Sequence, residues 1–422
     1  MNMTELGREA RIASKALAIA STGTKNAVLI KIADRLENQS ETVLAANTLD
    51  LLQGKQDGLS EALLDRLRLD PARLASIAAD LRSVAGLPDP VGEIFDNVSL
   101  PNGLRVHKQR VPLGVLGVIY EARPNVTVDV AGLALKSGNA AILRGGSETQ
   151  NSNRALVAMI QAALAENGLP VESLLFIDDP DRRRVLELLQ MHEYVDMLIP
   201  RGGAALHQFC RENSRIPVIT GGIGICHLYV DDSADLESAL KVIQNAKVQR
   251  PTVCNALDTV LVHRAVAAGF LPRLVNYLEK DGVAFRAHSS VIQYLREANL
   301  GLPASVQVAG PEDFDTEWLS LVIGLKVVDE LNQAIEHIAL HSTGHSDGIL
   351  TQNDSNARRF IAQVDSAAVY VNASTRFTDG AQLGLGAEVA ISTQRLHARG
   401  PMALRELTTY KWVIQGDYHV RK

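Results

Sequence analysis

The sequence predicts an α/β protein with two domains, each containing a parallel β-sheet. From Val115 onward, short apolar runs alternate with amphipathic stretches, and their spacing of about thirty residues is typical of βαβ units. The pattern starts again after Val230, and 422 residues exceed the usual size of one domain. We therefore expect two α/β domains, each with its own sheet.

The N-terminal part, residues 1–90, is helical in pattern. In the segment DPARLASIAADLRSV, Asp70 can cap a helix, and Pro71 can occupy the first helical position, where a missing N–H costs no hydrogen bond. An apolar stripe follows at helical spacing, formed by Leu74, Ile77, Ala78, Leu81 and Val84. Similar stripes within 6–19 and 28–36 predict further amphipathic helices.

A β-hairpin is predicted within residues 98–113. The segment VSLPNGLRVHKQRVPLG contains Asn102 and Gly103, two turn residues that both tolerate positive φ. The C-terminal segment TTYKWVIQG also has the composition of a strand. Because no strand neighbours it in the sequence, we expect it to pair with a strand from elsewhere.

The first set of strands consists of VLGVIY, AAILRG, SLLFID and VDMLIPRG. A helix over 155–166, closed by Gly168, lies between the second and third of these runs. The second set consists of DTVLVH, VAFRAH, ASVQVA, LSLVIGLKVVD, GILTQN and AAVYVNA. Since ligands bind at the carboxyl ends of parallel strands, the candidate sites are expected in the loops that follow them.

The composition excludes several classes of function. Hydrophobic residues make up 46% of the chain, and the net charge is −6 with a pI near 6, so we expect no general affinity for nucleic acid or for acidic membranes. No apolar stretch reaches the roughly eighteen residues that span a bilayer. The three cysteines contain no CxxC pair, so no metal site is expected. A cytoplasmic protein with reduced thiols is expected.

Two glycine-rich loops follow predicted strands, LRGGSE at 143–148 and PRGGAA at 200–205. Each combines an arginine with backbone that lacks side chains, which suits the close approach of a phosphate. The alternative is two tight strand-to-helix turns without a ligand. The GxGxxG and GxxxxGK[ST] patterns are both absent, so a nucleotide would have to be bound in another way.

Cys254, in QRPTVCNALDTVLV, is either a packed side chain or a nucleophile. A cysteine that is not in a disulfide most often behaves as a small buried hydrophobe, which favours packing when the residue is considered alone. His207, His227 and the pair in HSTGH are expected to be packed or surface residues rather than metal ligands. A Cys–His hydrolase remains open, because such partners need only be close in space.

Three longer segments then resemble the aldehyde dehydrogenase superfamily. They are VPLGVLGVIYEARPNVTVDVAGLALKSGNAAILRGGSE, PVITGGIGICHLYVDDSADLESAL and RPTVCNALDTVLVH, in this order. The resemblance covers nearly the whole chain and is closest to members that reduce γ-glutamyl phosphate. It implies an aldehyde dehydrogenase-like fold with two Rossmann-like domains and a small β oligomerisation element.

The resemblance also implies a division of the chain. The cofactor-binding domain is expected to comprise 1–97 and 114–230, the catalytic domain 231–372, and the return to the cofactor domain 373–406. Residues 98–113 and 407–415 are expected to be the oligomerisation strands. The orphan C-terminal strand would thereby gain a partner.

The family pattern assigns roles to individual residues. Cys254 matches the nucleophile, and Glu317 resembles the residue that contacts the nicotinamide ribose. The adenosine end of the cofactor is expected at Arg144, Gly145, Gly146 and Ser147, and the pyrophosphate at Arg201, Gly202 and Gly203. Arg144 would meet the 2′-phosphate, so NADP is expected in preference to NAD.

The sequence also departs from the family pattern. Where hydrolytic relatives have a glutamate that activates water, this chain has Ile219, or Thr220 if the alignment shifts by one. The segment YEARPN is rearranged, so Asn125 is the candidate side chain of the oxyanion hole, with Arg123 beside it as a substrate-binding residue. Arg376 is the second residue expected to bind substrate.

The implied reaction is the NADPH-dependent reduction of L-glutamyl 5-phosphate to L-glutamate 5-semialdehyde and phosphate, through a cysteine thioester, in proline biosynthesis. A homo-oligomer and a functional association with glutamate 5-kinase are further expectations. Two alternatives remain: a relative that passes the acyl group to coenzyme A or water, and a catalytically silent protein with the same fold. Assays with acyl phosphate and thioester substrates would separate the first, and a cofactor-dependent thioester would exclude the second.

Overall fold

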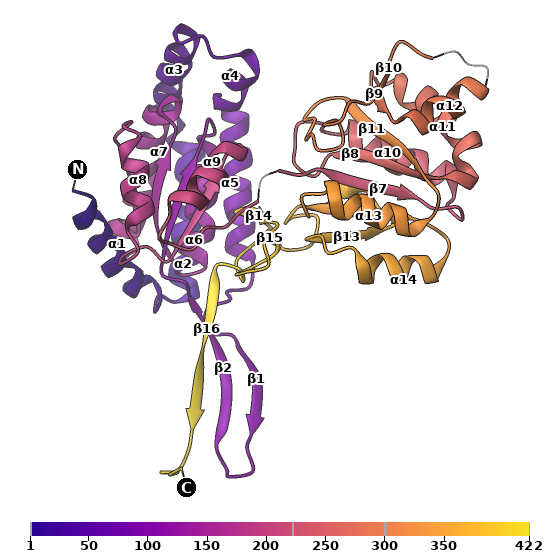
Figure 1. Ribbon diagram of the computed structural model, residues 1–422. Helices are drawn as coiled ribbons and strands as arrows, with labels where there is room; N and C mark the ends of the chain where they lie inside the picture. The colour runs from indigo at the N-terminus through magenta and orange to yellow at the C-terminus, as the bar shows by residue number, and fades with distance from the viewer. Residues whose placement is uncertain (1, 222, 299–301, 422) are drawn as a thin grey trace. The chain divides into compact units, whose positions relative to one another are not determined.

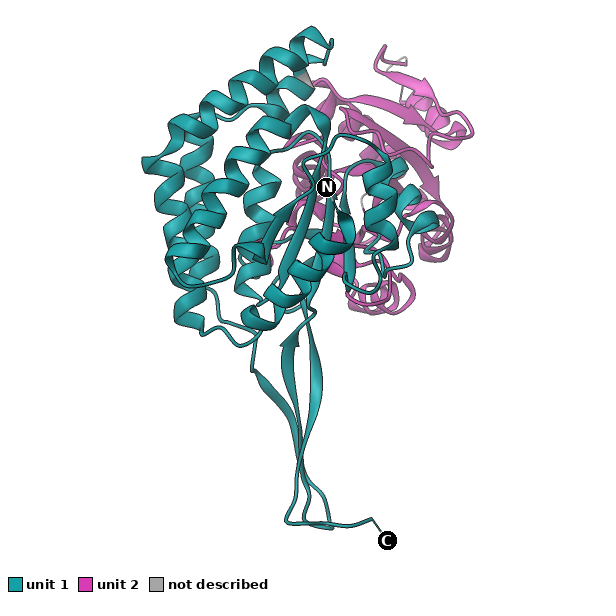
Figure 2. Cartoon of the chain, turned by 90° about the vertical axis from the view of Figure 1, so that its left-hand side faces the viewer, with its two compact units in different colours: residues 1–220, 384–390, 401–422 teal, residues 221–383, 391–400 magenta. Residues whose placement is uncertain are grey.

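The computed structural model describes residues 2–221, 223–298 and 302–421 and divides into two compact units. Unit 1 comprises Met1–Thr220, Gly384–Ala390 and Pro401–Lys422, and unit 2 comprises Gly221–Leu383 and Ile391–Gly400 (Figure 2). Both have the α/β architecture that the sequence predicts. No helix among the described residues is long and apolar enough to cross a membrane.

Unit 1 begins with the helices α1 (Met3–Leu17), α2 (Thr22–Asn38), α3 (Ser40–Gln56), α4 (Glu61–Leu67) and α5 (Pro71–Gly86). Short polar side chains cap the N-termini of α1, α2, α4 and α5. The Asp70 carboxylate accepts a hydrogen bond from the Arg73 N–H at 2.8 Å, with Pro71 in the first turn, as predicted. The predicted stripe from Leu74 to Val84 is buried.

A four-stranded parallel sheet forms the centre of unit 1, with the strand order β5-β4-β3-β6. Its strands are β3 (Val115–Tyr120), β4 (Ala140–Gly145), β5 (Leu174–Phe176) and β6 (Met197–Arg201). The connecting elements are α6 (Asn125–Lys136), η1 (Ser147–Thr149), α7 (Gln150–Glu166), η2 (Val171–Ser173), α8 (Arg183–Gln190) and α9 (Ala204–Asn213). Because β3 pairs with both β4 and β6, the loops after these three strands meet at one edge of the sheet.

A three-stranded antiparallel sheet, here called the arm, projects from the body of unit 1 (Figures 1 and 2). It consists of β1 (Ile94–Ser99), β2 (Arg105–Pro112) and β16 (Thr408–Gln415). The hairpin turn contains Gly103 with φ +90°, as the sequence predicts, although the first strand begins earlier than expected. The partner of the C-terminal strand is β2 of the same chain.

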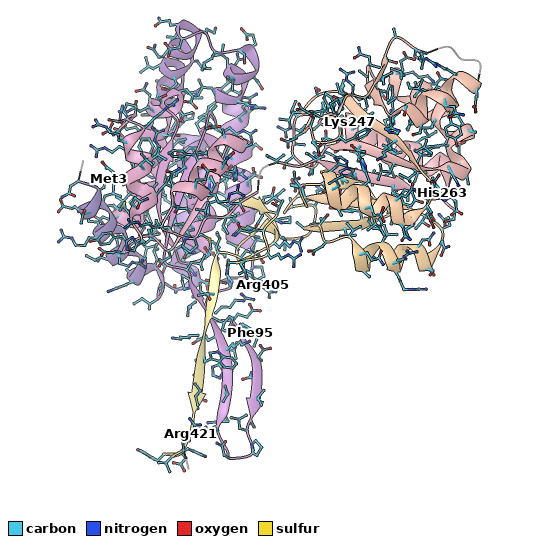
Figure 3. All side chains as sticks on the ribbon, in the orientation of Figure 1. Met3, Phe95, Lys247, His263, Arg405 and Arg421 are labelled. Carbon is cyan, nitrogen blue, oxygen red and sulfur yellow. The ribbon has the colours of Figure 1, made fainter. Side chains whose placement is uncertain are left out.

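The aromatic residues of the arm gather around one lysine. The Lys108 ammonium lies 4.7 Å from the ring centroid of Tyr410 and 4.9 Å from that of Trp412. Phe95, labelled in Figure 3, lies opposite Lys108 in the register and meets Tyr410 edge to face. These contacts fix the register of β16 on β2 through side chains as well as through the ladder.

Unit 2 contains a seven-stranded parallel sheet with the order β10-β9-β11-β8-β7-β12-β13. The strands are β7 (Cys226–Val230), β8 (Leu257–His263), β9 (Ala284–Ala287), β10 (Val306–Val308), β11 (Val322–Val328), β12 (Ser346–Leu350) and β13 (Ala368–Val371). The helices are α10 (Leu236–Val248), α11 (Arg264–Glu279), α12 (Ser289–Glu297), α13 (Leu331–His341), α14 (Asp354–Gln363) and η3 (Thr375–Phe377). Two short strands, β14 (Ala390–Ser392) and β15 (Gly400–Met402), pair with each other.

The division between the units differs from the expected domain boundaries. It falls before β7 rather than after it, because β7 pairs with β8 and β12 of unit 2. The return to unit 1 also comes later than residue 373. The segment that contains η3 stays with unit 2, because Thr375 donates a hydrogen bond to the carbonyl oxygen of Asn255 at 2.7 Å.

Candidate active site

Cys254 lies in the turn between α10 and β8 and is half-buried. Its carbonyl oxygen accepts a hydrogen bond from the Cys226 thiol at 3.3 Å. The next residue, Asn255, donates from its amide to the carbonyl oxygen of Thr378 at 2.9 Å. The turn is therefore attached to the start of β7 on one side and to the segment around η3 on the other.

A glycine-rich segment, residues 221 and 223–225 of those described, packs directly against this turn. A Cβ atom on Gly224 would lie only 1.6 Å from the carbonyl oxygen of Cys254. A Cβ atom on Gly221 would likewise lie 1.9 Å from the carbonyl oxygen of Ile391. Only glycine permits backbone to approach backbone so closely, so Gly224 determines where the Cys254 turn lies.

Two side chains hold the glycine-rich segment in place. Glu317 accepts a hydrogen bond from the Gly224 N–H at 2.9 Å. Thr343 accepts from the Ile225 N–H at 3.0 Å and donates to the carbonyl oxygen of Ile223 at 2.8 Å. Thr343 was missed by the sequence analysis, which considered HSTGH only as a possible metal pair. No local pattern could reveal its role, because Ile225 is 118 residues away in the chain.

A buried ion pair between Lys247 and Asp258 holds the backbone next to Glu317. Lys247, labelled in Figure 3, is fully buried. Its Nζ lies 3.3 Å from Oδ1 of Asp258, which also accepts from the Trp318 N–H at 3.2 Å. Burial lowers the pKa of Lys247 and raises the pKa of Asp258. Burial also raises the pKa of Glu317, with Asp258 adding to the effect. The ion pair thus fixes the 317–318 segment that supports Gly224.

Two arginines lie close to Cys254. Arg376, in η3, donates from Nε to the side chain of Gln249 at 3.1 Å. Burial lowers the pKa of Arg376, the positive charge of Arg250 lowers it further, and negative charge on Cys254 acts in the opposite direction. Arg376 therefore interacts electrostatically with both Arg250 and Cys254. Two guanidinium groups near a thiol can stabilise a thiolate and can bind an anionic substrate.

In unit 1, the turn between β3 and α6 carries Arg123 and Asn125. Arg123 is exposed, and the Asn125 amide donates to Oδ2 of Asp129 at 2.9 Å. Burial raises the pKa of Asp129 to about 6, although the hydrogen bond from Asn125 and the charge of Arg201 act against this. Since an amide NH2 group has two N–H bonds, Asn125 keeps one for another acceptor.

The first glycine-rich loop differs from the expectation of an open phosphate cradle. Arg144 is 8% exposed, and its guanidinium donates to the carbonyl oxygens of Gly145 and Pro180. A Cβ on Gly145 would lie 2.1 Å from the Asn153 amide, so the chain itself fills the space. Burial lowers the pKa of Arg144, and the charge of Arg182 contributes, which places the exposed Arg182 close by.

Next to Arg144, Gly146 and Ser147 lead from β4 into η1. A Cβ on Gly146 would lie 2.2 Å from Oε1 of Glu148, so a carboxylate of the chain occupies this space. Ser147 is exposed. The glycines of the first loop therefore accommodate the protein's own side chains.

The second loop, Arg201 to Gly203, is open only at its last residue, because a Cβ on Gly202 would lie 2.6 Å from Oε2 of Glu121. Gly203 is exposed and caps the N-terminus of α9, and a Cβ on it would meet no atom within 4 Å. Its N–H donates to Oε2 of Glu121 at 3.3 Å. Open backbone at a helix N-terminus suits the approach of a phosphate.

The histidines and the position of the missing base have structural partners. His227 is buried and bonded to Asp347, and His341 is bonded to Asp315. Within the described ranges, no group of three or more His, Cys, Asp or Glu side chains is arranged to hold a metal. The N–H of Ile219 donates to the carbonyl oxygen of Leu198 beside β6, and the Ile219 side chain is buried.

Comparison with known proteins gives a consistent picture. The sequence pattern of the aldehyde dehydrogenase family matches residues 2–286. The chain is 58% identical over 420 residues to a γ-glutamyl phosphate reductase from Photorhabdus laumondii, covering 100% of both chains. It is 59% identical over 422 residues to a protein of the same name from Roseiflexus castenholzii, covering 100% of this chain and 99% of the relative.

A solved structure shares the fold over almost the whole chain. The crystal structure of γ-glutamyl phosphate reductase from Thermotoga maritima superimposes with a TM-score of 0.96 at 48% identity and covers 99% of each chain.

The contact at Gly224 predicts the effect of one added methyl group. We expect Gly224→Ala to lower kcat/KM by on the order of a hundredfold, because the Cβ must displace the carbonyl of Cys254 and misplace the thiol. Gly269→Ala, in an exposed part of α11 where a Cβ meets nothing within 4 Å, is the matched control and should raise stability by about 0.5–1 kcal/mol. Steady-state kinetics and thermal unfolding measure both. Wild-type activity in Gly224→Ala would refute the constraint.

Proposed function

Because the chain belongs to the aldehyde dehydrogenase family, we propose that it reduces an acyl phosphate, L-glutamyl 5-phosphate, to L-glutamate 5-semialdehyde and phosphate in proline biosynthesis. The observation that carries the proposal is the full-length identity of 58–59% to relatives named γ-glutamyl phosphate reductase. In this reading, NADPH is the reductant, and a glutamate 5-kinase is the enzyme that supplies the substrate.

Cys254 is the proposed nucleophile. Its thiolate attacks the acyl carbon, and the carbonyl electrons move to oxygen to give a tetrahedral oxyanion. The oxyanion is proposed to accept hydrogen bonds from the Cys254 N–H and from the second N–H of Asn125. When the carbonyl re-forms, the bond from carbon to the phosphate oxygen breaks, and a thioester and inorganic phosphate result.

The charges around Cys254 fit this step. The substrate carries a phosphate and an α-carboxylate, and Arg376 interacts electrostatically with Cys254 and with Arg250. The leaving phosphate is a stable anion, so no acid has to protonate it. Arg376 and, in unit 1, the exposed Arg123 are the proposed ligands of the anionic ends of the substrate.

The absence of a base at 219 and 220 supports reduction rather than hydrolysis. Ile219 has no proton acceptor in its side chain, and a threonine hydroxyl is too weak a base to activate water at neutral pH. In this proposal, a thioester on Cys254 is reduced because no base is present at these positions to activate water. A relative with glutamate at this position would instead hydrolyse it.

Unit 1 provides groups that fit a nicotinamide dinucleotide, which supplies the hydride when it is bound. The open backbone at Gly203, the N-cap of α9, suits the pyrophosphate, and Gly202 precedes it in the loop. The buried guanidinium of Arg144 already bonds two carbonyl oxygens, so the exposed Arg182 beside it is the better placed to meet a 2′-phosphate. Glu317 in unit 2 is the proposed contact of the nicotinamide ribose.

We expect Arg182→Ala to lower kcat/KM for NADPH about tenfold while NADH is little affected, because an arginine–phosphate contact is charge-assisted. The matched control is Arg183→Ala, the next residue, whose guanidinium forms an ion pair with Asp181. Kinetics with both cofactors measure the preference. If Arg182→Ala keeps the preference for NADPH over NADH and Arg144→Ala loses it, then Arg144 is the residue that contacts the 2′-phosphate.

We expect wild type to oxidise NADPH when glutamyl phosphate is generated in situ, and Cys254→Ser to lose about a thousandfold or more in rate, because serine lacks a stable nucleophilic anion at neutral pH. Cofactor binding, measured by calorimetry, should survive. Cys210→Ala, at a buried thiol of α9 that contacts no proposed ligand, serves as the control. An active Cys254→Ser variant would exclude covalent catalysis at this residue.

The arm is proposed to pair subunits. β16 lies at the edge of its sheet, and Tyr410, Trp412 and Ile414 on it are 46–58% exposed. An apolar edge strand of eight residues tends to pair with another chain. We therefore propose at least a homodimer.

Deletion of residues 408–422 should abolish the assembly, because it removes β16 and leaves the edge of β2 unpaired. Light scattering should then report monomer or aggregate. Deletion of 417–422 alone, which leaves β16 intact, is the control and should keep the wild-type mass. An unchanged mass in the longer deletion would contradict pairing through the arm.

A further inference from the structure

Ala122, in the turn between β3 and α6, has a backbone conformation that only glycine adopts without cost. Its φ is +39°, in the left-handed region that an alanine side chain disfavours. Ala122 directly precedes Arg123, and Arg123 directly precedes the start of α6 at Pro124 and Asn125. The conformation of this one residue therefore sets the direction of the turn that carries both proposed ligands.

The N–H group of Ala122 is held by a carboxylate from the neighbouring loop. It donates to Oε1 of Glu148 at 2.6 Å, a short bond to a charged acceptor. Glu148 follows β4, and Ala122 follows β3, so the bond joins two loops at the same edge of the sheet. A hydrogen bond of this kind can hold a strained residue in place where the turn sequence alone would not.

Gly146 makes this bond possible. A Cβ atom on Gly146 would lie 2.2 Å and 2.4 Å from the two carboxylate oxygens of Glu148, so any side chain there would displace the carboxylate. The loop is itself fixed, because Thr149 donates from N and from Oγ1 to the carbonyl oxygen of Gly146, and the Asn153 amide donates to Thr149. Glu148 is thus presented to Ala122 from a rigid base.

The opposite side of the turn is fastened to the other glycine-rich loop. The N–H of Glu121 donates to the carbonyl oxygen of Arg201 at 3.2 Å, and the Glu121 carboxylate accepts from the Gly203 N–H at 3.3 Å. Beyond Ala122, the carbonyl oxygen of Arg123 accepts from the Val126 N–H at 3.1 Å. A rotation at Ala122 would therefore move Arg123 and the first turn of α6 together.

We infer that Glu148 is a positioning residue for substrate: its carboxylate fixes the backbone of Ala122 and thereby the placement of Arg123 and Asn125. The inference rests on the proposed function, since it takes Arg123 and Asn125 as ligands of the acyl phosphate. It also assigns a purpose to the second glycine of LRGGSE, which makes room for this carboxylate rather than for a phosphate.

The first arm of the test is kinetic. Glu148→Ala should raise the KM for glutamyl phosphate about tenfold or more, because a hydrogen bond to a charged group is lost, whereas Glu148→Gln, which keeps an acceptor oxygen, should lose much less. Calorimetry with NADP should give a Kd within about twofold of wild type in both variants, because neither substitution removes a proposed cofactor contact. Glu193→Ala, an exposed glutamate of unit 1, is the matched control.

The second arm is a rescue. Glycine adopts positive φ without strain, so Ala122→Gly should restore most of the lost KM when it is combined with Glu148→Ala. Hydrogen exchange of the peptide spanning 120–126 should be faster in Glu148→Ala than in wild type and unchanged in Glu193→Ala. A merely structural role for Glu148 would lower stability without a selective change in KM and without rescue at residue 122.

The outcomes separate the inference from the proposed function. A wild type that does not reduce glutamyl phosphate would refute the function, whereas unchanged exchange at 120–126 in folded Glu148→Ala would refute the inference for any substrate. A raised Kd for NADP with an unchanged KM for the acyl phosphate would make Glu148 a cofactor ligand and overturn the positioning role. Absence of rescue by Ala122→Gly in a folded double variant would overturn it as well.

Discussion

The candidate site in unit 2 depends on the packing of Gly224 against the carbonyl oxygen of Cys254. A Cβ atom added to Gly224 would lie 1.6 Å from that oxygen. The turn that carries Cys254 depends on this contact because it has little regular structure of its own. Glu317 and Thr343 are hydrogen-bonded to the glycine-rich segment. The buried ion pair of Lys247 and Asp258 holds the backbone next to Glu317, because Asp258 accepts from the Trp318 N–H. Polar side chains far apart in the chain are therefore organised around one contact between two backbones.

A buried ion pair is a costly way to support a loop, because two charges must leave water. In this protein, the ion pair fixes the orientation of the neighbouring backbone. Asp258 accepts from both Lys247 and the backbone of Trp318, so the 317–318 segment has one position relative to β8. A hydrophobic pair of similar size would pack as well but would not orient the Glu317 carboxylate toward Gly224. Specific placement of a thiol needs this kind of directional contact.

The glycines of unit 1 have two different uses, although both loops contain Arg-Gly-Gly. In the first loop, the space beside Gly145 and Gly146 is filled by the Asn153 amide and the Glu148 carboxylate. In the second loop, Gly203 faces open space at the start of α9. The Glu121 carboxylate fills the space beside Gly202 in the same way. Of these glycines, only Gly203 therefore leaves open backbone for an anion, and the first loop acts as a support for the turn between them.

The sequence identified Cys254 as the candidate nucleophile only through the family resemblance, because the residue considered alone favours packing. The sequence alone also determined the fold class, the helices of the N-terminal part and the hairpin. These features depend on local signals: caps, apolar periodicity, turn residues, and motifs that lie within a few residues. The tertiary structure decided which strand β16 pairs with, on which side of the division β7 lies, that the Arg144 guanidinium turns inward, and that Thr343 and Glu148 hold the loops of the site. Each of these depends on hydrogen bonds between residues distant in the chain or on the space that a missing Cβ leaves. Local composition encodes neither these hydrogen bonds nor this space, because both arise only when the strands are brought side by side.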